Sequence, residues 1–514
     1  MSTHPPYKDL VRHHAAGRPD RVAIRNLSSG RALTYAQLDR RADRLARHLQ
    51  DAGVARGDRV AILAYNGAEF FELQYACSRI GAVAVLLNWR LSVPELEYIV
   101  RDCTPLLLLH DVAFQDAATR LEQVAGLRSL LAIDAGDPNS SYERALAAAE
   151  APPAWADVTH DDLCLLMYTS GTTGHPKGAL ITHGMVWWNT VNVTFACHIS
   201  SDAVQLVILP LFHIGGLNSH ANPILHAGGT IVLHRSFEPG EALRAIGDAA
   251  LGITHLTGVP AQYQFMAAHP RFAETDLRRL QFVGVGGSPI AMVTIEAWTG
   301  RGVPMAQGFG MTESCPGALS LDTADILRKP GSIGRPLPYT DVRVVADDGR
   351  SASPGEVGEL WLRGPNIAPG YWKNPPGSGG AFVDGWFRTG DAARMDDEGF
   401  FYIVDRVKDM YISGGENVYP AEVENVLYQF AQVGEAAVIG VPHARWGETG
   451  LAIVAPRAGA EIDAQQLIAH CAARLAKFKV PAEIVVVDAL PRTAAGKVLK
   501  RELRQRYKAA PRET

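Results

Sequence analysis

The sequence predicts an α/β protein, and three features of the 514-residue chain predict that class. Over most of the chain, short β-rich runs alternate with stretches of helical periodicity, which is typical of parallel sheets covered by helices on both faces. Residues 341–405 change to short β runs separated by Gly, Pro and Asp, a pattern that favours hairpins in a small β-subdomain. Residues 406–514 form a further unit of a size that folds alone. We therefore divide the chain into an N-terminal domain, residues 1–405, and a C-terminal domain, residues 406–514.

The alternation of strands and helices is clearest in the first three hundred residues. Residues 21–24 and 60–64 are β-rich, and residues 35–49 between them repeat apolar side chains at helical spacing. By the same criteria further strands are predicted at residues 163–168, 204–209, 230–233 and 282–285, and further helices at residues 240–249 and 289–298.

The C-terminal unit shows a different order: strand, helix, strand, strand, helix, strand, helix. The helix predicted at residues 420–430 has Pro420 in its first turn, where a missing N–H leaves no helical hydrogen bond unmade. Residues 484–490 read as a strand, and residues 497–508 as a basic helix.

Composition and charge exclude several classes of protein. Hydrophobic residues make up 47% and charged residues 20%, which is typical of a globular chain with a large core. The 49 Lys and Arg against 54 Asp and Glu leave no basic excess, so we expect no nucleic-acid partner. The six cysteines show no metal-site or disulfide spacing and read as buried apolar residues of a reducing compartment. Neither a signal-peptide pattern nor an apolar run of ~18 residues is present, so we expect a cytoplasmic protein without a membrane span.

Residues 168–178 carry the strongest chemical signal. They read YTSGTTGHPKG directly after the apolar run LCLLM. A strand that ends in glycines, hydroxyl groups and Lys177 suits phosphate, because exposed backbone N–H groups and a cation bind its oxygens. The loop is not a Walker A loop, since Pro176 and Gly178 stand where that motif needs Gly and Ser or Thr. A polar surface loop is the alternative, and the density of these residue types after a buried strand disfavours it.

This run resembles the signature of the adenylate-forming superfamily, which includes acyl-CoA and aryl-CoA synthetases. Other motifs of that family occur in the family's order between about residues 20 and 505. They are PLFHIGG at residues 210–216, GGSP at 286–289, QGFGMTE at 307–313, GWFRTGD at 385–391, DRVKD at 405–409, SGGEN at 413–417 and PRTAAGK at 491–497. The resemblance implies a large N-terminal domain of two α/β-layered sheets plus a small β-subdomain, followed by a mobile small α+β C-terminal domain. It also implies an AMP-forming acid–CoA ligase that uses ATP, CoA and Mg²⁺.

The resemblance assigns roles to residues of this chain through the matching motifs. The implied catalytic residues are Lys497, Thr312, Glu313 and His213, with Glu313 also the Mg²⁺ ligand. The implied ATP and AMP contacts are Thr169, Ser170, Gly171, Thr172, Thr173, Gly174, Lys177, Gly287, Ser288, Pro289, Phe309, Gly310, Asp391 and Arg406. Lys408 is the implied hinge, and Gly414, Gly415 and Trp446 the implied CoA contacts. The acyl pocket is assigned to His213, Gly216, Val259, Gly286 and Gly308.

Several of these residues have a second interpretation when they are taken alone. Lys497 reads as a solvated residue of a basic helix, Asp391 as a turn residue, Arg406 as a surface ion-pair partner of Asp405 or Asp409, and His213 and Trp446 as core residues. Phe309 also departs from the family, whose members usually have Tyr at that position. Its ring can still stack on adenine.

Two other functions compete with the ligase. The first is an adenylation enzyme that loads a carrier protein. Amino-acid-activating enzymes of this kind carry an Asp soon after the PLF position, whereas this chain has His213, Ile214 and Gly215 there, which disfavours that alternative. A binding protein without ligase activity is the second, and Lys497, Glu313 and Asp391 disfavour it. The segments predicted to line the acyl pocket, residues 212–218, 259–262, 283–286 and 308–316, carry no charged side chain apart from Glu313. This favours an apolar aliphatic or aryl acid. The identity of the acid and the oligomeric state, with a homo-oligomer as one alternative, are left open.

Overall fold

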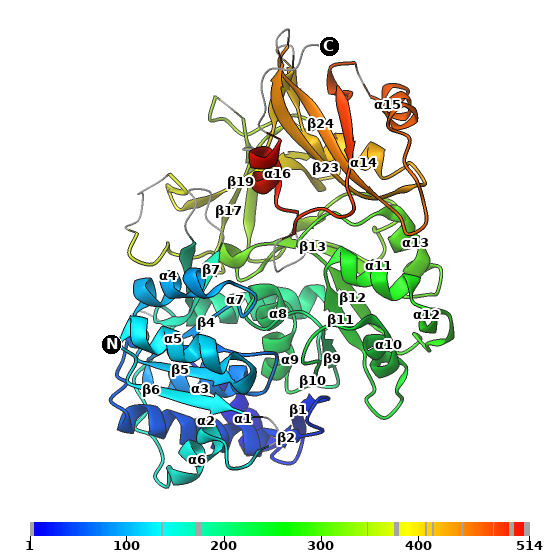
Figure 1. The fold of residues 1–514 in the computed structure, drawn as a ribbon. Coiled ribbons are helices and arrows are strands. Elements are labelled where there is room, and N and C mark those ends of the chain that lie inside the picture. The colour runs from blue at the N-terminus through cyan, green and yellow to red at the C-terminus, as the bar shows by residue number, and fades with distance from the viewer. Residues whose placement is uncertain are drawn as a thin grey trace. The chain divides into compact units, whose positions relative to one another are not determined.

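The computed structural model describes residues 5–134, 137–169, 176–346, 348–374, 380–406, 409–413, 416–443, 446–475, 477–492 and 498–507 (Figure 1). The chain divides into two compact units. The first contains Met1–Asp341 and Leu362–Phe387, and the second contains Val342–Trp361 and Arg388–Thr514. The boundary predicted between residues 405 and 406 stays a prediction, and each unit is described by itself.

A six-stranded sheet lies in the N-terminal part of the first unit. Its strand order is β6-β5-β3-β4-β7-β8. The strands are β3 (Arg59–Leu63), β4 (Val83–Leu86), β5 (Leu107–Asp111), β6 (Ser129–Ile133), β7 (Leu163–Thr169) and β8 (Lys177–Thr182). All neighbours are parallel except β8, which runs antiparallel to β7.

A nine-stranded sheet forms the other half of this unit, in the order β15-β14-β13-β12-β11-β9-β10-β1-β2. The strands are β1 (Val22–Asn26), β2 (Ala32–Thr34), β9 (Val204–Val207), β10 (Thr230–Leu233), β11 (His255–Gly258), β12 (Phe282–Val285), β13 (Met305–Gly310), β14 (Gly317–Leu321) and β15 (Arg335–Pro336). The strands from β13 to β1 are parallel, and antiparallel strands close both edges. Gly258 pairs with Val285, and Val285 with Gln307, so the carboxyl ends of three neighbouring strands meet at one edge.

Helices cover these sheets, as the alternating pattern predicts. They are α1 (Leu10–Gly17), α2 (Tyr35–Asp51), α3 (Glu69–Ile80), α4 (Val93–Cys103), α5 (Gln115–Ala125), α6 (Ser141–Ala148), α7 (His183–Ala196), α8 (Ile214–Asn218), α9 (Ala221–Ala227), α10 (Pro239–Gly247), α11 (Pro260–Ala268), α12 (Arg271–Glu274) and α13 (Met292–Thr299). Thr34 and Gln37 start α2 with a capping box. Every residue of α3 is buried, because this helix shares one core with strands of both sheets.

A β-rich segment follows, as predicted for residues 341–405. β16 (Asp341–Val345), β17 (Gly358–Arg363), β18 (Phe382–Val383), β19 (Trp386–Met395) and β20 (Phe401–Arg406) form a five-stranded sheet in which β20 pairs with β19. The division between the two units passes along this sheet.

The C-terminal part of the second unit contains a second five-stranded sheet. Its strands are β21 (Tyr411–Ser413), β22 (Glu416–Val418), β23 (Val433–His443), β24 (Gly447–Pro456) and β25 (Glu483–Val486), and its helices are α14 (Pro420–Leu427), α15 (Ala464–Ala472) and α16 (Lys500–Arg506). Val438 and Val454 of the sheet share a core with Leu427 of α14 and Leu467 of α15.

The α/β fold class is confirmed, and the differences lie at the ends of elements. The helix predicted from residue 289 begins at Met292, because Gly287 adopts φ 82° and turns the chain first. The strand predicted after residue 405 is a hairpin, β21 with β22. All six cysteines are free and buried. In the part of the chain that the structure describes, no helix combines the length and apolarity needed to cross a bilayer.

Candidate active site

The predicted acyl pocket lies at the carboxyl ends of β11, β12 and β13, which are neighbours in the large sheet (Figure 1). The Gly286 N–H donates to the Gly258 carbonyl oxygen at 3.2 Å. A Cβ on Gly286 would lie 3.2 Å from the Gly308 carbonyl oxygen, and one on Gly287 would lie 3.5 Å from Cγ1 of Val259. The structure therefore brings Val259, Gly286 and Gly308 together at this edge, where ligands bind in open α/β sheets.

The predicted adenine contacts lie at the same edge. Gly287, Ser288 and Pro289 are exposed, and Gly287 needs to be glycine because its φ is 82°. Phe309 is half-buried on β13, next to β12, which leads into this turn. An exposed turn beside an aromatic ring is what a planar base needs for stacking and edge contacts.

Thr312 and Glu313 follow β13 in a short 3-10 helix, Thr312–Ser314. Glu313 is 8% exposed, and Oε1 of its carboxylate accepts a hydrogen bond from the Tyr371 hydroxyl at 2.7 Å. Burial first, and then the Glu313 charge, raise the pKa of Tyr371 far above its usual value. The Ala368 N–H donates to the Glu313 carbonyl oxygen at 2.8 Å, so both the backbone and the side chain of Glu313 are held.

Buried amides fix the chain just after Glu313. Nδ2 of Asn366 donates to the carbonyl oxygens of Ser314 and Gly317, at 3.1 and 2.8 Å. The Gly317 N–H donates to Oδ1 of Asn189 at 3.0 Å. A Cβ on Gly310 would lie 1.6 Å from the Pro316 carbonyl oxygen, so this loop admits no side chain there. Neither the asparagines nor Tyr371 were found from the sequence, because no local motif marks them.

The predicted phosphate loop joins β7 to β8. Thr169 and Lys177 are opposite each other where the two strands end, and the Thr169 hydroxyl donates to the Lys177 carbonyl oxygen at 3.4 Å. Nζ of Lys177 lies 5.5 Å from the ring centroid of Tyr371. The remaining predicted phosphate contacts, Ser170, Gly171, Thr172, Thr173 and Gly174, lie outside the described residues.

His213 precedes α8 in the loop after β9. Its Nε2 is buried and has no hydrogen-bond partner among the described residues. Burial, and secondarily the charge of Arg90, lower the pKa of His213 to about 4. The imidazole is therefore neutral at pH 7. Because one of its buried nitrogens has no hydrogen-bond partner among the described residues, the interpretation of His213 as an ordinary core residue is disfavoured. Close packing alone explains why residue 216 is glycine, since a Cβ there would lie 2.1 Å from the Pro210 carbonyl oxygen.

The second unit holds the other predicted site residues. Asp391 is 4% exposed on β19, and its N–H donates to the Thr389 hydroxyl at 3.0 Å. Asp391 pairs with Arg406 across β19 and β20, so the two residues are neighbours, as a shared ribose site requires; the Arg406 side chain is not among those described. Trp446 is 41% exposed, which argues against its interpretation as a core residue. Lys408, Gly414, Gly415 and Lys497 lie outside the described residues.

The described residues at the predicted site offer Glu313 as a protein ligand for Mg²⁺. Among the described residues, no three His, Cys, Asp or Glu side chains gather as a metal site. Glu313 contributes a single carboxylate, and Mg²⁺ commonly binds through one or two carboxylates plus substrate phosphates. The donor set therefore fits a metal that arrives with ATP.

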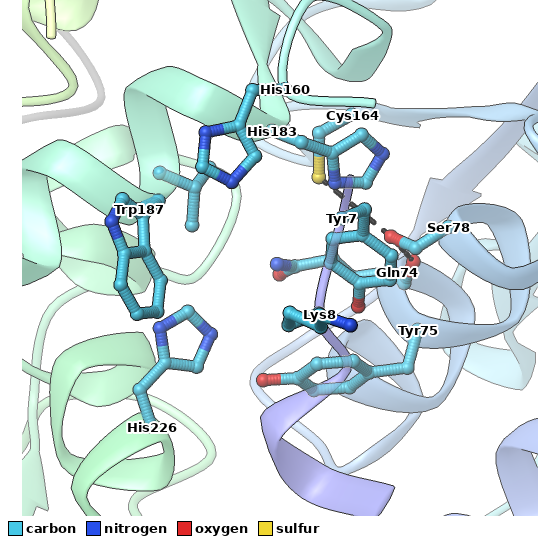
Figure 2. Close-up of a pocket in the computed structure, with 11 residues that line it drawn as sticks. Tyr7, Lys8, Gln74, Tyr75, Ser78, His160, Cys164, His183, Trp187 and His226 are labelled. Carbon is cyan, nitrogen blue, oxygen red and sulfur yellow. Dashed lines mark hydrogen bonds between the residues drawn. The ribbon is translucent and has the colours of Figure 1, made fainter. Parts of the chain in front are cut away.

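A cavity elsewhere in the first unit is shown in Figure 2. Tyr7 lies beside His183, with 4.4 Å between their ring centroids, and Tyr75 and Gln74 of α3 face them. The cavity lining contains none of the predicted site residues. Nε2 of His183 and the Tyr75 hydroxyl are buried without a partner among the described residues.

Comparison with known proteins identifies the family. The AMP-binding enzyme family matches residues 11–372, and the AMP-binding enzyme C-terminal domain matches residues 422–497. The feruloyl-CoA synthase of an Amycolatopsis species is 45% identical over 95% of this chain and 96% of its own length. The indoleacetate–CoA ligase of Aromatoleum aromaticum is 41% identical over 97% of each chain. The crystal structure of ATP-bound MatB from Rhodopseudomonas palustris aligns with a TM-score of 0.90 at 33% identity, covering 98% of this chain and 99% of that one.

The fold is that of adenylate-forming enzymes with a large N-terminal and a small C-terminal domain. The chain belongs to the AMP-binding enzyme family. It is an AMP-forming acid–CoA ligase, and its substrates are ATP, CoA and a carboxylic acid. The predicted family, fold class and reaction are therefore confirmed.

Proposed function

We propose that this ligase activates an apolar aryl carboxylic acid. The carboxylate attacks the α-phosphorus of ATP, the acyl-adenylate forms and diphosphate leaves. The thiol of CoA then attacks the acyl carbonyl, the thioester forms and AMP leaves with the bond electrons. Because ATP and CoA are cytoplasmic substrates, the same proposal places the enzyme in the cytoplasm.

The observation that carries the activation step of this proposal is the state of His213. Its buried Nε2 lacks a partner among the described residues, and a neutral imidazole at the acyl pocket can donate one hydrogen bond to a substrate oxygen. The acid is already ionised at pH 7, so the reaction needs no general base. His213 therefore orients the reacting group and does not take its proton.

The pocket geometry supports an apolar acid of some size. Gly308 leaves open space, since the nearest atom to a Cβ built there is the Leu319 carbonyl oxygen at 3.8 Å. Gly215 is similar, with the nearest side-chain atom, Cδ1 of Leu209, at 3.8 Å. No Asp, Lys or Arg occurs in residues 212–218, 259–262 or 283–286, so these segments supply no partner for a second charge on the acid.

The relatives favour the aryl alternative over the aliphatic one. The two at 45% and 41% identity are named for feruloyl and indoleacetyl groups, whereas a long-chain-fatty-acid–CoA ligase of Mycobacterium tuberculosis is 37% identical. The open space beside Gly308 also leaves room for an aromatic ring.

The remaining roles rest on the family motifs. Lys497 offsets the charge that develops as the carboxylate approaches the α-phosphate, and Thr312 binds that phosphate. A change of backbone dihedrals at Lys408 rotates the C-terminal domain, so that Gly414 and Gly415 replace Lys497 beside the pocket before CoA enters.

A panel of acids tests the proposed substrate class. Acid-dependent diphosphate release is measured with ferulate, indole-3-acetate, benzoate, octanoate, palmitate and 2-succinylbenzoate at equal concentration. We expect the highest kcat/KM with one of the aryl monocarboxylates and at least a tenfold lower value for the diacid, since residues 212–218, 259–262 and 283–286 supply no cation for a second carboxylate. A preference for palmitate or for the diacid would contradict the aryl assignment while leaving the ligase class intact.

A further inference from the structure

We infer that Tyr371 is a positioning residue for adenylate formation. Its side chain holds the Glu313 carboxylate and the Lys177 ammonium in fixed positions relative to each other. The inference rests on the proposed roles of Glu313 at the metal and Lys177 at the phosphates. It adds a residue that belongs to neither motif, and it predicts how binding of ATP depends on Mg²⁺.

The backbone around Tyr371 is attached to both phosphate-binding segments. The Trp372 N–H donates to the Gly178 carbonyl oxygen at 2.7 Å, and Tyr371 forms a β-bridge with Ala179 of β8. Three residues earlier, the Ala368 N–H donates to the Glu313 carbonyl oxygen at 2.8 Å. One short segment therefore ties β8, which begins at Lys177, to the 3-10 helix that carries Glu313.

The side chain of Tyr371 contacts the functional groups themselves. Its hydroxyl donates to Oε1 of Glu313 at 2.7 Å, and the ammonium of Lys177 lies 5.5 Å from its ring centroid. The ring is half-buried and packs edge-on against Phe382, at 5.8 Å between centroids. The packed ring thus has one orientation, which fixes where its hydroxyl and its face point.

These contacts give the two parts of the side chain different tasks. The hydroxyl fixes one carboxylate oxygen of Glu313 and with it the rotation of the carboxylate plane, which decides where a metal ligand points. The ring face attracts the Lys177 ammonium and keeps it near Glu313. Lys177 and Glu313 are therefore held in place before ATP arrives, which lowers the entropic cost of binding.

Two substitutions separate these tasks. Tyr371→Phe removes the hydroxyl and keeps the ring, and Tyr371→Leu removes both. Binding of ATP is measured by calorimetry without acid, so that no turnover occurs, once with Mg²⁺ and once with EDTA. Tyr402→Phe is the matched control, because its hydroxyl also lies near a carboxylate, 3.1 Å from Oδ2 of Asp396, in the second unit.

For Tyr371→Phe we expect the affinity for ATP with Mg²⁺ to fall about tenfold, the effect of losing one hydrogen bond to a charged group. Its affinity for ATP in EDTA should stay within about twofold, because Lys177 is still held by the ring. Tyr371→Leu should lose affinity under both conditions, and Tyr402→Phe under neither. In a Glu313→Gln background, Tyr371→Phe should cost no further affinity with Mg²⁺.

Either of two results would overturn the inference: a Tyr371→Phe variant that binds ATP with Mg²⁺ as tightly as the parent, or one that loses equal affinity with Mg²⁺ and with EDTA. The second result would mean that Tyr371 only supports the fold. If the parent releases no diphosphate with any acid, the proposed function fails instead, and the binding contrast still decides the role of Tyr371.

Discussion

The side-chain oxygen of Asn66 accepts a hydrogen bond from the Leu211 backbone N–H at 2.8 Å. The amide nitrogen of the same side chain donates to the Leu209 carbonyl oxygen at 2.9 Å. Asn66 follows β3 of the smaller sheet, and Leu211 precedes His213 in the loop after β9 of the larger one. One buried amide thus ties the loop that carries His213 to the other sheet.

We expect Asn66→Ala to loosen this loop. The substitution removes two hydrogen bonds and leaves buried backbone groups unpaired, so the free energy of unfolding should fall by about 1–3 kcal/mol. The KM for the acid should rise more than the KM for ATP, which is measured with the preferred acid at saturation. Equal effects on both constants would show that Asn66 serves general stability and not the acyl pocket.

Gly308→Leu should narrow the range of accepted acids. The Gly308 backbone does not lie in the left-handed region, and a Cβ built there would lie 3.8 Å from its nearest neighbour, the Leu319 carbonyl oxygen. A side chain therefore fits at this position without backbone strain. Each excluded methylene changes discrimination by about 1–3 kcal/mol, so kcat/KM should fall with the size of the acid while the KM for ATP stays unchanged.

Gly310→Ala is the matched control for Gly308→Leu, because its Cβ would lie 1.6 Å from the Pro316 carbonyl oxygen. This variant should lose activity with every acid and bind ATP more weakly. If Gly308→Leu behaves in the same way, the glycine serves the strand and the pocket assignment is wrong.

The pH dependence of the ligase should show no contribution from His213 near neutrality. Burial lowers the pKa of His213 to about 4, so the imidazole is neutral throughout pH 5.5–8. We expect His213→Gln to raise the KM for the acid about tenfold, the effect of one hydrogen bond to a charged group, with the shape of the profile unchanged. A limb of the parent profile near pH 6.5 that disappears in His213→Gln would contradict this role.

The buried carboxyl of Glu69 should make the free energy of unfolding fall as pH rises. Burial first, and then the charge of Glu72, raise the pKa of Glu69 to about 7 in the folded state. Between about pH 4.5 and 7 the unfolded chain releases this proton while the folded chain retains it, so the free energy of unfolding falls with pH by up to about 3 kcal/mol. Above pH 7 that penalty is complete.

Glu69→Gln removes this titration and should therefore be more stable than the parent above pH 7 and similar to it near pH 4.5. Denaturant melts at several pH values measure the difference, with Glu274→Gln on the exposed side of α12 as the control. A constant difference between Glu69→Gln and the parent at all pH values would contradict the shifted pKa.

The sequence predicted the parts of this molecule that depend on local patterns. The strands at residues 230–233 and 282–285 coincide with β10 and β12, because runs of β-branched and apolar residues mark buried strands. Gly286 and Gly308 lie at the edge where the carboxyl ends of the neighbouring strands β12 and β13 meet.

Long-range contacts explain what the sequence did not reveal. Tyr371 reaches Glu313 across 58 residues, and Asn66 reaches Leu211 across 145. The complete burial of α3 could not be predicted for the same reason. Arg79 of this helix forms ion pairs with Asp9, Asp39 and Asp43, and no spacing rule links residues that far apart in the sequence.

This chain should make an acyl-adenylate before it makes a thioester, and the two half-reactions can be measured separately. With ATP, Mg²⁺ and the preferred acid but no CoA, the parent should release diphosphate and retain the adenylate, and AMP should appear only when CoA is added. Lys497→Ala should lose acid-dependent diphosphate release by several orders of magnitude and still convert pre-made acyl-adenylate and CoA into thioester. Diphosphate release that requires CoA, or equal loss of both half-reactions in Lys497→Ala, would contradict the account.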